Sequence, residues 1–436
     1  MILKVKNIKN IQGVVDAPSS KSYSHRAIIL SSIAKGTSKL FNCLLSEDTL
    51  ASINFCKTIG AEINQKEDYL EVKGVNGKLH NNSSTPIDLA NSGTTLRIAT
   101  SLSALSDIPI TLTGDDSLRT RPMGILLNTL KTLGIATDSV NEKAPITIYP
   151  GYKGGETTIS GNISSQFISS ILISAPYSNL GVDLLVLPEF KSKPYVDMTI
   201  DIMNKFGVAV FEEPYTKHED CGKEVKDCEI IHYKVLNQNY KGCNYTVEGD
   251  YSSASYLLAA VAIAGGEIKI NNLFKESKQG DKFILDILKD MGCKITCNED
   301  NVVISSDGNL QGVDVNLSDA PDLLITVAVL GALAKGTTNI TGVAHARVKE
   351  TDRIATTTEE LRKIGVDVKE YQDGMTIEGG VKGGIIDSHG DHRLAMAFSL
   401  IGLKYPIEIE DGECFDISFP NFIESMEKIG YELELI

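Results

Sequence analysis

A helix-ending glycine motif recurs six times along this chain. The six motifs are CKTIG, LKTLG, MNKFG, LKDMG, LRKIG and MEKIG, and they end at Gly60, Gly134, Gly207, Gly292, Gly365 and Gly430. Alternating apolar residues follow each motif, which predicts a helix closed by a left-handed glycine and then a strand. The glycines are 74, 73, 85, 73 and 65 residues apart. A repeat of this size predicts one structural module that is used six times.

Each module also has an earlier half. A helix of small residues runs into a short strand at 31–42, 103–114, 262–272 and 331–342, and more loosely at 173–186 and 400–411. The predicted module is therefore helix, strand, helix, strand, with one or two further strands, and the fold class is α/β. Six modules in 436 residues divide most simply into two halves of three.

The domain boundary is expected where this rhythm breaks. Between Phe211 and Tyr245 the chain is charged and has no helical periodicity. We place the return crossing near Thr246 and the first crossing after Ala17. One discontinuous domain would then contain residues 1–17 and 246–436, and an inserted domain would contain residues 18–245. Two crossings predict a hinge.

The composition excludes several classes of partner. The formal net charge of −15 disfavours nucleic acid and acidic membranes. No apolar run reaches about 18 residues, and residues 1–15 alternate Lys with apolar residues, unlike a signal peptide. Eight cysteines without a C-x-x-C motif indicate buried free thiols in a reducing compartment. We therefore expect a soluble cytoplasmic protein, with a monomer as the simplest state.

Groups that bind anions gather at the predicted helix starts. The first helices of the modules start at SSKSYSHR (19–26), NSGTTLR (91–97), SSQ (164–166), GDYSSAS (249–255), DAPD (319–322) and GDHR (390–393), and later helices start at LRTRP (118–122), KSKPY (191–195), KQGDK (278–282) and VKETDR (348–353). Free N–H groups at a helix N-terminus carry positive partial charge and accept anions. If the repeat symmetry points these ends toward one cleft, that cleft would bind phosphates and carboxylates.

Each motif alone has an ordinary structural explanation. SSKSYSHR can be a serine-capped helix, SKPY an ordinary turn into a helix, and NSGTTLR resembles a phosphate nest that lacks the Lys of a P-loop. Lys349 and Arg353 are like charges at i and i+4, which indicates an anion between them. His389 and His392 form H-x-x-H, but Arg393 would repel a cation and no third ligand group is apparent nearby, so we expect no metal.

The motifs taken together suit a ligand with two anionic groups. Seven cations lie at predicted helix starts in both halves of the chain: Lys21, Arg26, Arg97, Arg121, Lys349, Arg353 and Arg393. Asp322 and Glu350 are the carboxylates among them. This inventory indicates two phosphate or carboxylate groups on the ligand and a reaction with proton transfer.

Over essentially its whole length the chain resembles the 5-enolpyruvylshikimate-3-phosphate synthase family. The motifs KSYSHR, NSGTTLR, RTRPM, ISSQF, SKPY, EGDYSSASY, DAPD, RVKETDR and GDHR stand in the order found in that family. The resemblance implies a two-domain inside-out α/β barrel of six βαβαββ units, three in each domain. It also implies transfer of the enolpyruvyl group of phosphoenolpyruvate to the 5-hydroxyl of shikimate 3-phosphate, in the shikimate pathway to chorismate and aromatic amino acids, without metal or organic cofactor.

The resemblance also implies roles for individual residues. The phosphoenolpyruvate ligands would be Lys21, Gly93, Arg121, Gln166, Arg353 and Arg393. The shikimate 3-phosphate ligands would be Lys21, Ser22, Arg26, Ser164, Ser165, Gln166, Ser192, Tyr195, Asp322 and Lys349. Asp322 would accept the hydroxyl proton, and Glu350, with Lys21 nearby, would protonate the methylene carbon. Small Gly93 would leave room for glyphosate beside phosphoenolpyruvate, which predicts an enzyme sensitive to that inhibitor.

Two positions depart from the family pattern. Some members have Asn where this chain has His345, so His345 receives no substrate contact. Some members also have Lys two residues before the Phe-Pro pair near the C-terminus, where this chain has Ile417. One phosphate contact is therefore missing or comes from elsewhere.

Three alternative functions stay open from the sequence. The sister enzyme that transfers enolpyruvate to a UDP-sugar uses a Cys in the loop before its Arg-Pro pair, whereas this loop reads GDDSLRTRP. A noncatalytic anion-binding relative would have no need of Asp322 and Glu350. An RNA-end-processing relative of the repeat fold is disfavoured by the net charge of −15. We expect the free protein to be open, because seven converging cations repel one another, and to close on shikimate 3-phosphate.

Overall fold

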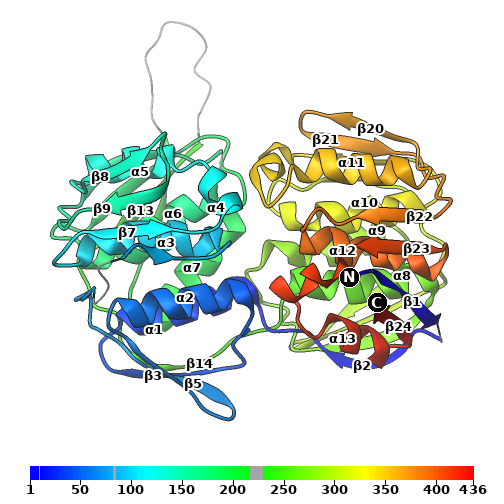
Figure 1. Ribbon diagram of the computed structural model, residues 1–436, viewed down its shortest axis with the longest axis horizontal. Coiled ribbons are helices and arrows are strands. Elements are labelled where there is room, and N and C mark those ends of the chain that lie inside the picture. The colour runs from blue at the N-terminus through cyan, green and yellow to red at the C-terminus, as the bar shows by residue number, and fades with distance from the viewer. Residues whose placement is uncertain (9, 82–84, 163, 217–228) are drawn as a thin grey trace, which may run out of the picture. The chain divides into compact units, whose positions relative to one another are not determined.

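The described chain forms two compact units. The computed structural model describes residues 1–8, 10–81, 85–162, 164–216 and 229–436 (Figure 1). Met1–Ser20 and Glu248–Ile436 form one unit, called the discontinuous unit, and Lys21–Val247 form the other, called the inserted unit.

The chain passes between the two units at two segments that are hydrogen-bonded to each other. The two crossing segments pair with each other, because Ser20 N donates to Glu248 O at 2.8 Å and Asp250 N donates to Pro18 O at 2.7 Å. The chain therefore changes units after Ser20 and after Val247, slightly later than the expected changes after Ala17 and Tyr245.

The described residues form six sheets of four strands, three sheets in each unit. The inserted unit has the strand orders β14-β3-β5-β4, β6-β7-β9-β8 and β10-β11-β13-β12, and the discontinuous unit has β2-β15-β17-β16, β18-β19-β21-β20 and β22-β23-β1-β24. In every sheet the first two strands are parallel and the other neighbouring pairs are antiparallel. This shared order confirms the predicted sixfold α/β repeat.

Strand bounds are as follows. The inserted unit contains β3 (Thr37–Phe41), β4 (Glu62–Gln65), β5 (Tyr69–Lys73), β6 (Ile87–Asp88), β7 (Ile110–Thr113), β8 (Thr137–Val140), β9 (Lys143–Ile148), β10 (Gly155–Ser160), β11 (Val182–Leu187), β12 (Phe211–Thr216), β13 (Glu229–Val235) and β14 (Asn244–Thr246). The discontinuous unit contains β1 (Leu3–Ile8), β2 (Gln12–Asp16), β15 (Gly266–Asn271), β16 (Lys294–Cys297), β17 (Asn301–Ser306), β18 (Asp314–Asn316), β19 (Thr338–Thr341), β20 (Val368–Tyr371), β21 (Gly374–Ile377), β22 (Gly384–Asp387), β23 (Ile407–Glu410) and β24 (Tyr431–Leu435).

Helix bounds follow the same division. The inserted unit contains α1 (Lys21–Ile33), α2 (Glu47–Thr58), α3 (Gly93–Leu102), α4 (Asp116–Thr120), α5 (Gly124–Thr132), α6 (Ser165–Ser174) and α7 (Lys193–Lys205), with 3-10 turns η1 (Ser103–Leu105) and η2 (Ala175–Tyr177). The discontinuous unit contains α8 (Tyr251–Ala264), α9 (Ile284–Asp290), α10 (Leu324–Leu333), α11 (Arg353–Lys363), α12 (His392–Ser399) and α13 (Phe422–Lys428), with η3 (Gly280–Phe283), η4 (Pro321–Leu323), η5 (Ala344–Val348), η6 (Leu400–Leu403) and η7 (Gly412–Ile417).

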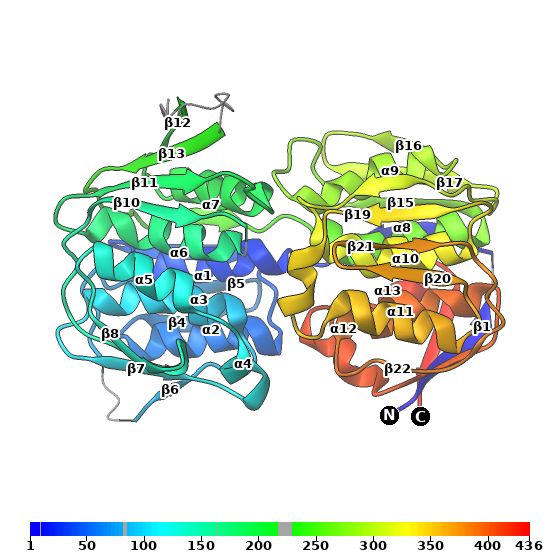
Figure 2. The same ribbon diagram turned by 90° about the horizontal axis from the view of Figure 1, so that it is seen from above.

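Three helices in each unit are buried along nearly their whole length. They are α1, α3 and α6 in the inserted unit and α8, α10 and α12 in the discontinuous unit. Their small residues, as in SSASYLLAAVAIA of α8, allow close packing on every side. In each unit the strands lie toward the outside and these helices lie between them (Figure 2). Each unit has its own apolar core.

The structure confirms the predicted glycine caps but shows strands that were not predicted in the segment from Phe211. All six motif glycines have φ between 82° and 107°, so the predicted left-handed caps are confirmed. The segment that begins at Phe211, charged and without helical periodicity, forms β12 at the edge of one sheet and β13 between β11 and β12. An edge strand tolerates charges because one side has no neighbour, and this masks the strand pattern. Residues 217–228 of that segment lie outside the described residues.

Two general expectations can be compared with the described residues. Cys43, Cys56, Cys243, Cys293, Cys297 and Cys414 are free thiols, whereas Cys221 and Cys228 lie outside the described ranges. None of the helices in those ranges combines the length and the apolar character that crossing a bilayer requires.

Candidate active site

The buried helices present the predicted site motifs at their starts. In the inserted unit, α1 begins at Lys21, α3 at Gly93 and α6 at Ser165, and in the discontinuous unit α12 begins at His392 while η4 leads into α10. Several motif residues also cap their helices: Ser92, Ser164, Asp250, Asp352 and Asp391 each accept a hydrogen bond from a backbone N–H of the first turn. The motifs that predict ligand binding therefore also contain the residues that cap these helices.

Asp322 is the centre of an ion-pair cluster in the discontinuous unit. Its Oδ1 lies 3.0 Å from Nη1 of Arg353 and 3.7 Å from Nζ of Lys349. Its Oδ2 lies 2.8 Å from Nη2 of Arg393. The structure thus brings together four predicted site residues, from η4, from the end of η5 and from the starts of α11 and α12. Glu350 joins them, because its Oε2 lies 2.7 Å from Nη2 of Arg353.

Arg353 is buried among carboxylates. Its Nε lies 2.7 Å from Oδ2 of Asp391, which is also buried. Burial alone would lower the pKa of Arg353, but the charges of Asp391, Glu350 and Asp322 raise it above its ordinary value. Burial likewise opposes ionisation of Asp391, yet the adjacent Arg353 lowers the pKa of that carboxyl. Arg353 is therefore held as a fixed cation that aligns Asp322 and Glu350.

Arg393 has polar partners on both sides. Its Nη2 contacts Asp322, while its Nη1 donates to Oγ of Ser252 at 2.8 Å and lies 3.4 Å from the hydroxyl of Tyr256. Ser252 and Tyr256 are on α8, so the GDYSSASY motif fixes the arginine of GDHR. The motif GDYSSASY gave no role to Ser252 or Tyr256. No local signal could pair either of them with Arg393, which lies more than 130 positions away.

Two guanidinium groups flank Gly93 in the inserted unit. A Cβ at Gly93 would lie 2.5 Å from Nη1 of Arg121 and 3.0 Å from Nη1 of Arg97. Arg97 donates to the side-chain oxygen of Gln166, and Arg121 donates to that of Asn91. The amide partners bring no negative charge, so the groups around Gly93 form a positively charged surface suited to an anion.

Lys21 is paired with an acid that the sequence analysis missed. Nζ of Lys21 lies 3.0 Å from Oδ2 of Asp48, and Nε2 of the buried His25 lies 3.4 Å from Oδ1 of the same residue. Burial would raise the pKa of Asp48, but Lys21 and His25 hold it well below its ordinary value. Asp48 lies in the first turn of α2, where an acid reads as an ordinary helix-dipole partner.

Arg26 makes its hydrogen bonds to the protein itself. The buried guanidinium donates to Oγ1 of Thr199 at 2.7 Å, to the carbonyl of Ser22 at 2.9 Å and to the carbonyl of Tyr195 at 3.0 Å. It also lies 3.5 Å from Oγ of Ser169. Burial lowers the pKa of Arg26 to about 10. In this arrangement Arg26 joins α1, α6 and α7, and a direct substrate contact would require it to exchange a partner.

The predicted shikimate 3-phosphate residues at α6 and α7 lie at helix starts. Ser164 caps α6 through Gln166 N at 3.3 Å, and Ser165 is buried beside it. Ser192 precedes α7 with φ 58° and ψ 37°, a left-handed conformation that costs energy in a residue other than glycine. Tyr195 N donates to the carbonyl of Ser192 at 3.2 Å, which holds this turn.

The structure places both residues that depart from the family pattern, His345 and Ile417. His345 is buried in η5, four residues before Lys349. Ile417 ends η7 and is partly exposed, and residues 412–421 contain no Lys or Arg. The family's additional cation is therefore absent from this described segment.

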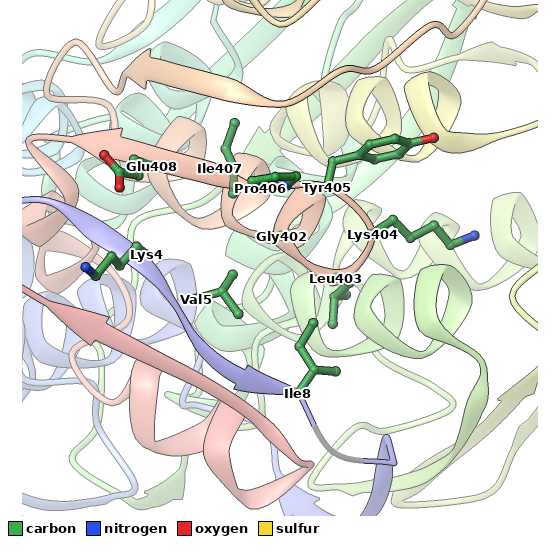
Figure 3. Close-up of a pocket in the computed structure, with 10 residues that line it drawn as sticks. All are labelled: Lys4, Val5, Ile8, Gly402, Leu403, Lys404, Tyr405, Pro406, Ile407 and Glu408. Carbon is green, nitrogen blue, oxygen red and sulfur yellow. The ribbon is translucent and has the colours of Figure 1, made fainter.

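A groove in the discontinuous unit lies apart from these residues. It measures about 370 Å³ and is lined by Lys4, Val5 and Ile8 of β1 and by residues 402–408. None of the predicted site residues lines it. In Figure 3 the side chains of Val5 and Leu403 lie between those of the other labelled residues, whereas the ammonium groups of Lys4 and Lys404 point to opposite sides. Its cations do not converge as an anion site requires.

The chemistry of the candidate site follows from these clusters. The discontinuous unit supplies two carboxylates, Asp322 and Glu350, held by Arg353, and the inserted unit supplies the guanidinium groups of Arg97 and Arg121 beside Gly93. Within the described ranges no three His, Cys, Asp or Glu side chains are grouped as metal ligands. The arrangement suits binding of anions together with proton transfer by carboxyl groups.

Comparisons with known proteins agree with this chemistry. The family model for EPSP synthase (3-phosphoshikimate 1-carboxyvinyltransferase) matches residues 5–426. A 3-phosphoshikimate 1-carboxyvinyltransferase of Methanobrevibacter smithii is 66% identical over 438 aligned positions, with complete coverage of both chains. The enzyme of the same name from Methanothermobacter thermautotrophicus is 51% identical, again with complete coverage of both. The solved EPSP synthase of Acinetobacter baumannii superposes with a TM-score of 0.79 at 28% identity and covers 99% of each chain.

Proposed function

Because the chain belongs to the EPSP synthase family, we propose that it transfers the enolpyruvyl group of phosphoenolpyruvate to the 5-hydroxyl of shikimate 3-phosphate and releases phosphate. The observation that carries this proposal is the position of Asp322. Its two carboxylate oxygens accept hydrogen bonds from Arg353 and Arg393, and Glu350 also accepts one from Arg353. A base and an acid are thus held side by side among cations.

The first half of the reaction is an addition. Asp322 accepts the proton of the 5-hydroxyl as that oxygen bonds to C2 of phosphoenolpyruvate. Glu350 delivers a proton to the methylene carbon, so that a tetrahedral adduct with a methyl group forms. Glu350 is suited to this role because its side chain is 27% exposed, whereas its partner Arg353 is buried. Lys21 assists by holding the phosphate groups.

The second half is an elimination. The methyl group of the adduct returns a proton to Glu350, the C–O bond to phosphate breaks, and the double bond forms again. Cations stabilise the departing phosphate, since negative charge gathers on it as the bond breaks. Arg353 and Arg393 would serve here in the discontinuous unit, with Lys21 and Arg121 in the inserted unit.

The substrate ligands in this proposal are those that the family motifs predict. Phosphoenolpyruvate would contact Lys21, Gly93, Arg121, Gln166, Arg353 and Arg393, and shikimate 3-phosphate would contact Lys21, Ser22, Arg26, Ser164, Ser165, Gln166, Ser192, Tyr195, Asp322 and Lys349. Support comes from the clusters within each unit, because each unit brings several of these residues together. The reaction requires both units to contact the same pair of substrates. We further propose that the two units act as domains joined by a hinge, and that the enzyme works as a cytoplasmic monomer.

The proposal is tested by measuring phosphate release from phosphoenolpyruvate with two acceptors. Shikimate 3-phosphate should support turnover, and UDP-N-acetylglucosamine should not. Asp322→Asn should lower kcat by about 100-fold or more, because an amide cannot accept the hydroxyl proton. Asp314→Asn on exposed β18 in the same module is the matched control and should retain activity. Turnover with the UDP-sugar, or full activity of Asp322→Asn, would refute the assignment.

A further inference from the structure

Lys349 and Glu350 lie on a stretch of chain between η5 and α11. This stretch, residues 342–352, is called the η5–α11 segment. Its residues 349–352 are neither helix nor strand, so no regular ladder of backbone hydrogen bonds sets their course. The side chains of Arg347 and Asp373 connect the segment to the turn between β20 and β21, a hairpin that lies beside α11 (Figure 1).

Arg347 binds the turn of this hairpin. Its Nε donates to the carbonyl of Gln372 at 3.0 Å, and its Nη2 donates to the carbonyl of Tyr371 at 2.7 Å. Nη2 also donates to Oε1 of Glu370 at 2.8 Å. The side chain of Arg347 is only 17% exposed, so water competes little for these hydrogen bonds. The guanidinium is therefore fixed against the end of the hairpin.

The remaining nitrogen of the same guanidinium binds the start of α11. Nη1 of Arg347 donates to Oδ1 and Oδ2 of Asp352 at 3.1 and 2.9 Å. Oδ1 of Asp352 also accepts from Ala355 N at 3.0 Å and so caps the helix. Lys349 and Glu350 lie between Arg347 and Asp352 in the sequence. One guanidinium thus fixes both ends of the stretch that contains them.

Asp373 holds the beginning of the η5–α11 segment on the same turn. Its Oδ2 accepts from Gly342 N at 3.1 Å, and its Oδ1 accepts from Ala344 N at 2.6 Å. The carbonyl of Asp373 accepts from Val343 N at 3.2 Å. The hairpin turn therefore binds the segment where it begins and, through Arg347, where it ends.

We propose that Arg347 is a positioning residue, which ties the η5–α11 segment to the β20–β21 turn and so sets the places of Glu350 and Lys349. This inference rests on the proposed function and deepens it. Proton transfer from Glu350 to carbon requires a precise distance, and a shift of about 1 Å in a reacting group can cost about 100-fold in rate. Loss of Arg347 should therefore lower kcat through Glu350 and weaken shikimate 3-phosphate binding through Lys349.

The phosphoenolpyruvate ligand Arg353 is held by other contacts. Its Nε lies 2.7 Å from Oδ2 of Asp391, and its Nη1 lies 3.0 Å from Oδ1 of Asp322. Neither acid belongs to the η5–α11 segment. Loss of the Arg347 contacts should therefore change the KM for phosphoenolpyruvate least, and this difference distinguishes a local shift from general damage to the fold.

Arg347→Met in the full chain tests the role, because methionine keeps an apolar side chain and removes every donor. It should lower kcat about tenfold or more, raise the KM for shikimate 3-phosphate about fivefold, and leave the KM for phosphoenolpyruvate within about twofold. Arg362→Met is the matched control. Nε and Nη2 of Arg362 donate to the carbonyl of Val368 at 3.2 and 3.0 Å, so this arginine joins the same helix to the same hairpin. It should keep all three constants within about twofold. Equal losses in both variants, unchanged kinetics of Arg347→Met, or a rise only in the KM for phosphoenolpyruvate would overturn the inference.

Two further variants keep the test decisive if Arg347→Met fails to fold, which thermal unfolding shows. Arg347→Lys retains a cation for Asp352 or Glu370 but cannot also reach the carbonyls of the turn, so kcat should fall about threefold to fivefold. Asp373→Ala removes the acceptor at the other end of the segment and should lower kcat about threefold, again with an unchanged KM for phosphoenolpyruvate. Wild-type kinetics in both variants would contradict the positioning role.

Amide hydrogen exchange keeps this inference separate from the proposed reaction. In the free protein, Arg347→Met should exchange residues 344–352 about tenfold or more faster than wild type, while α10 should exchange as in wild type. Arg362→Met should leave the exchange of residues 344–352 unchanged. Unchanged exchange of these residues in Arg347→Met would refute the positioning role even if the enzyme is active. If wild type releases no phosphate with either acceptor, the proposed function is wrong, and the exchange rates still decide whether Arg347 fixes the segment.

Discussion

Gly93 illustrates how a single missing methyl group shapes a binding surface. The side chains of Arg97 and Arg121 approach its Cα so closely that any Cβ would touch both guanidinium groups. The backbone itself places no such demand, because Gly93 is not among the residues with positive φ. Glycine is therefore needed here because a side chain would not fit between the two guanidinium groups, and not because the backbone of α3 requires it.

Replacement of Gly93 by Ala tests that space. The new Cβ would lie 2.5 Å from Nη1 of Arg121, so the guanidinium must shift. We expect the KM for phosphoenolpyruvate to rise about threefold to tenfold and the inhibition constant of glyphosate to rise more, because the inhibitor needs the room that Cβ takes. Steady-state kinetics with and without glyphosate measure both values. Unchanged inhibition would contradict the proposed place of the inhibitor. Thr94→Ser is the control, since it alters the adjacent residue without adding volume.

Arg26 shows the limit of reading a charge from sequence. The motif placed it with the substrate cations, but its side chain is buried and its hydrogen bonds join α1 to α6 and α7. A sequence motif gives the residue and the helix start, but it does not say whether protein or ligand receives the donors.

The stability of Arg26→Met separates the two readings. Its loss removes one hydrogen-bond donor from Thr199 Oγ1 and from the carbonyls of Ser22 and Tyr195, which should lower the free energy of unfolding by about 2 to 3 kcal/mol. Urea unfolding measures the change. Arg119→Met is the control, because the side chain of Arg119 is 48% exposed and should contribute about 0.5 kcal/mol or less. A variant of normal stability that has lost affinity for shikimate 3-phosphate would show that Arg26 serves the substrate alone.

The positions of the acids explain what the sequence could and could not supply. Lys21, Arg353 and Arg393 were predicted because each stands at a helix start within a local motif. Asp48 was missed as the partner of Lys21, since it reaches that cation from α2 and resembles an ordinary acid near a helix start. Pairing across distant segments is a property of the fold, which no local pattern contains.

At the scale of elements, the glycine ending is the most predictable feature of the chain. Helix and strand meet at a sharp turn, and a residue with positive φ makes that turn without a steric penalty only when it lacks Cβ. The edge strand β12 and its neighbour β13 were not predicted, because charged residues interrupt the alternation that identifies a strand. The residues that form a turn are adjacent in the sequence, so the turn can be predicted from them. Strand pairing depends on strands that are distant in the sequence, so it cannot.

A test at one such turn uses Gly292, where φ is 107° and a Cβ would meet only a carbonyl oxygen at 3.8 Å. Space is therefore not limiting, and the backbone conformation alone decides the outcome. Gly292→Ala should lower the free energy of unfolding by about 1 to 2 kcal/mol. Gly292→Asn should lower it less, since asparagine tolerates the left-handed region better. Equal losses for the two variants, measured by urea unfolding, would show that contacts rather than φ set the cost.

At the scale of the whole molecule, carboxylates offset the charge of several predicted cations. The cations of the discontinuous unit lie against Asp322, Glu350 and Asp391, so their mutual repulsion is largely offset. In the inserted unit Lys21 lies against Asp48, while Arg97 and Arg121 donate to amide side chains. The repulsion inferred from the sequence is therefore smaller than seven free cations would produce.

Small-angle scattering tests whether the substrate draws the units together. We expect the radius of gyration to fall when shikimate 3-phosphate binds, because ligands that contact both units favour the state in which both contacts form. Shikimate without its phosphate is the control and should produce a smaller change at equal concentration. Identical scattering profiles with and without shikimate 3-phosphate would contradict the proposed hinge.

The placement of β1 has a consequence for how the protein is made. This strand is made before the whole inserted unit, yet it pairs with β23 and β24, which are made after that unit. The inserted unit is complete once Val247 has emerged, because β14 pairs with β3. The nascent chain can therefore finish one unit early, whereas β1 must wait until β23 and β24 have been made. Emergence of β24 from the ribosome then becomes the step that permits the sheet of β1 to close.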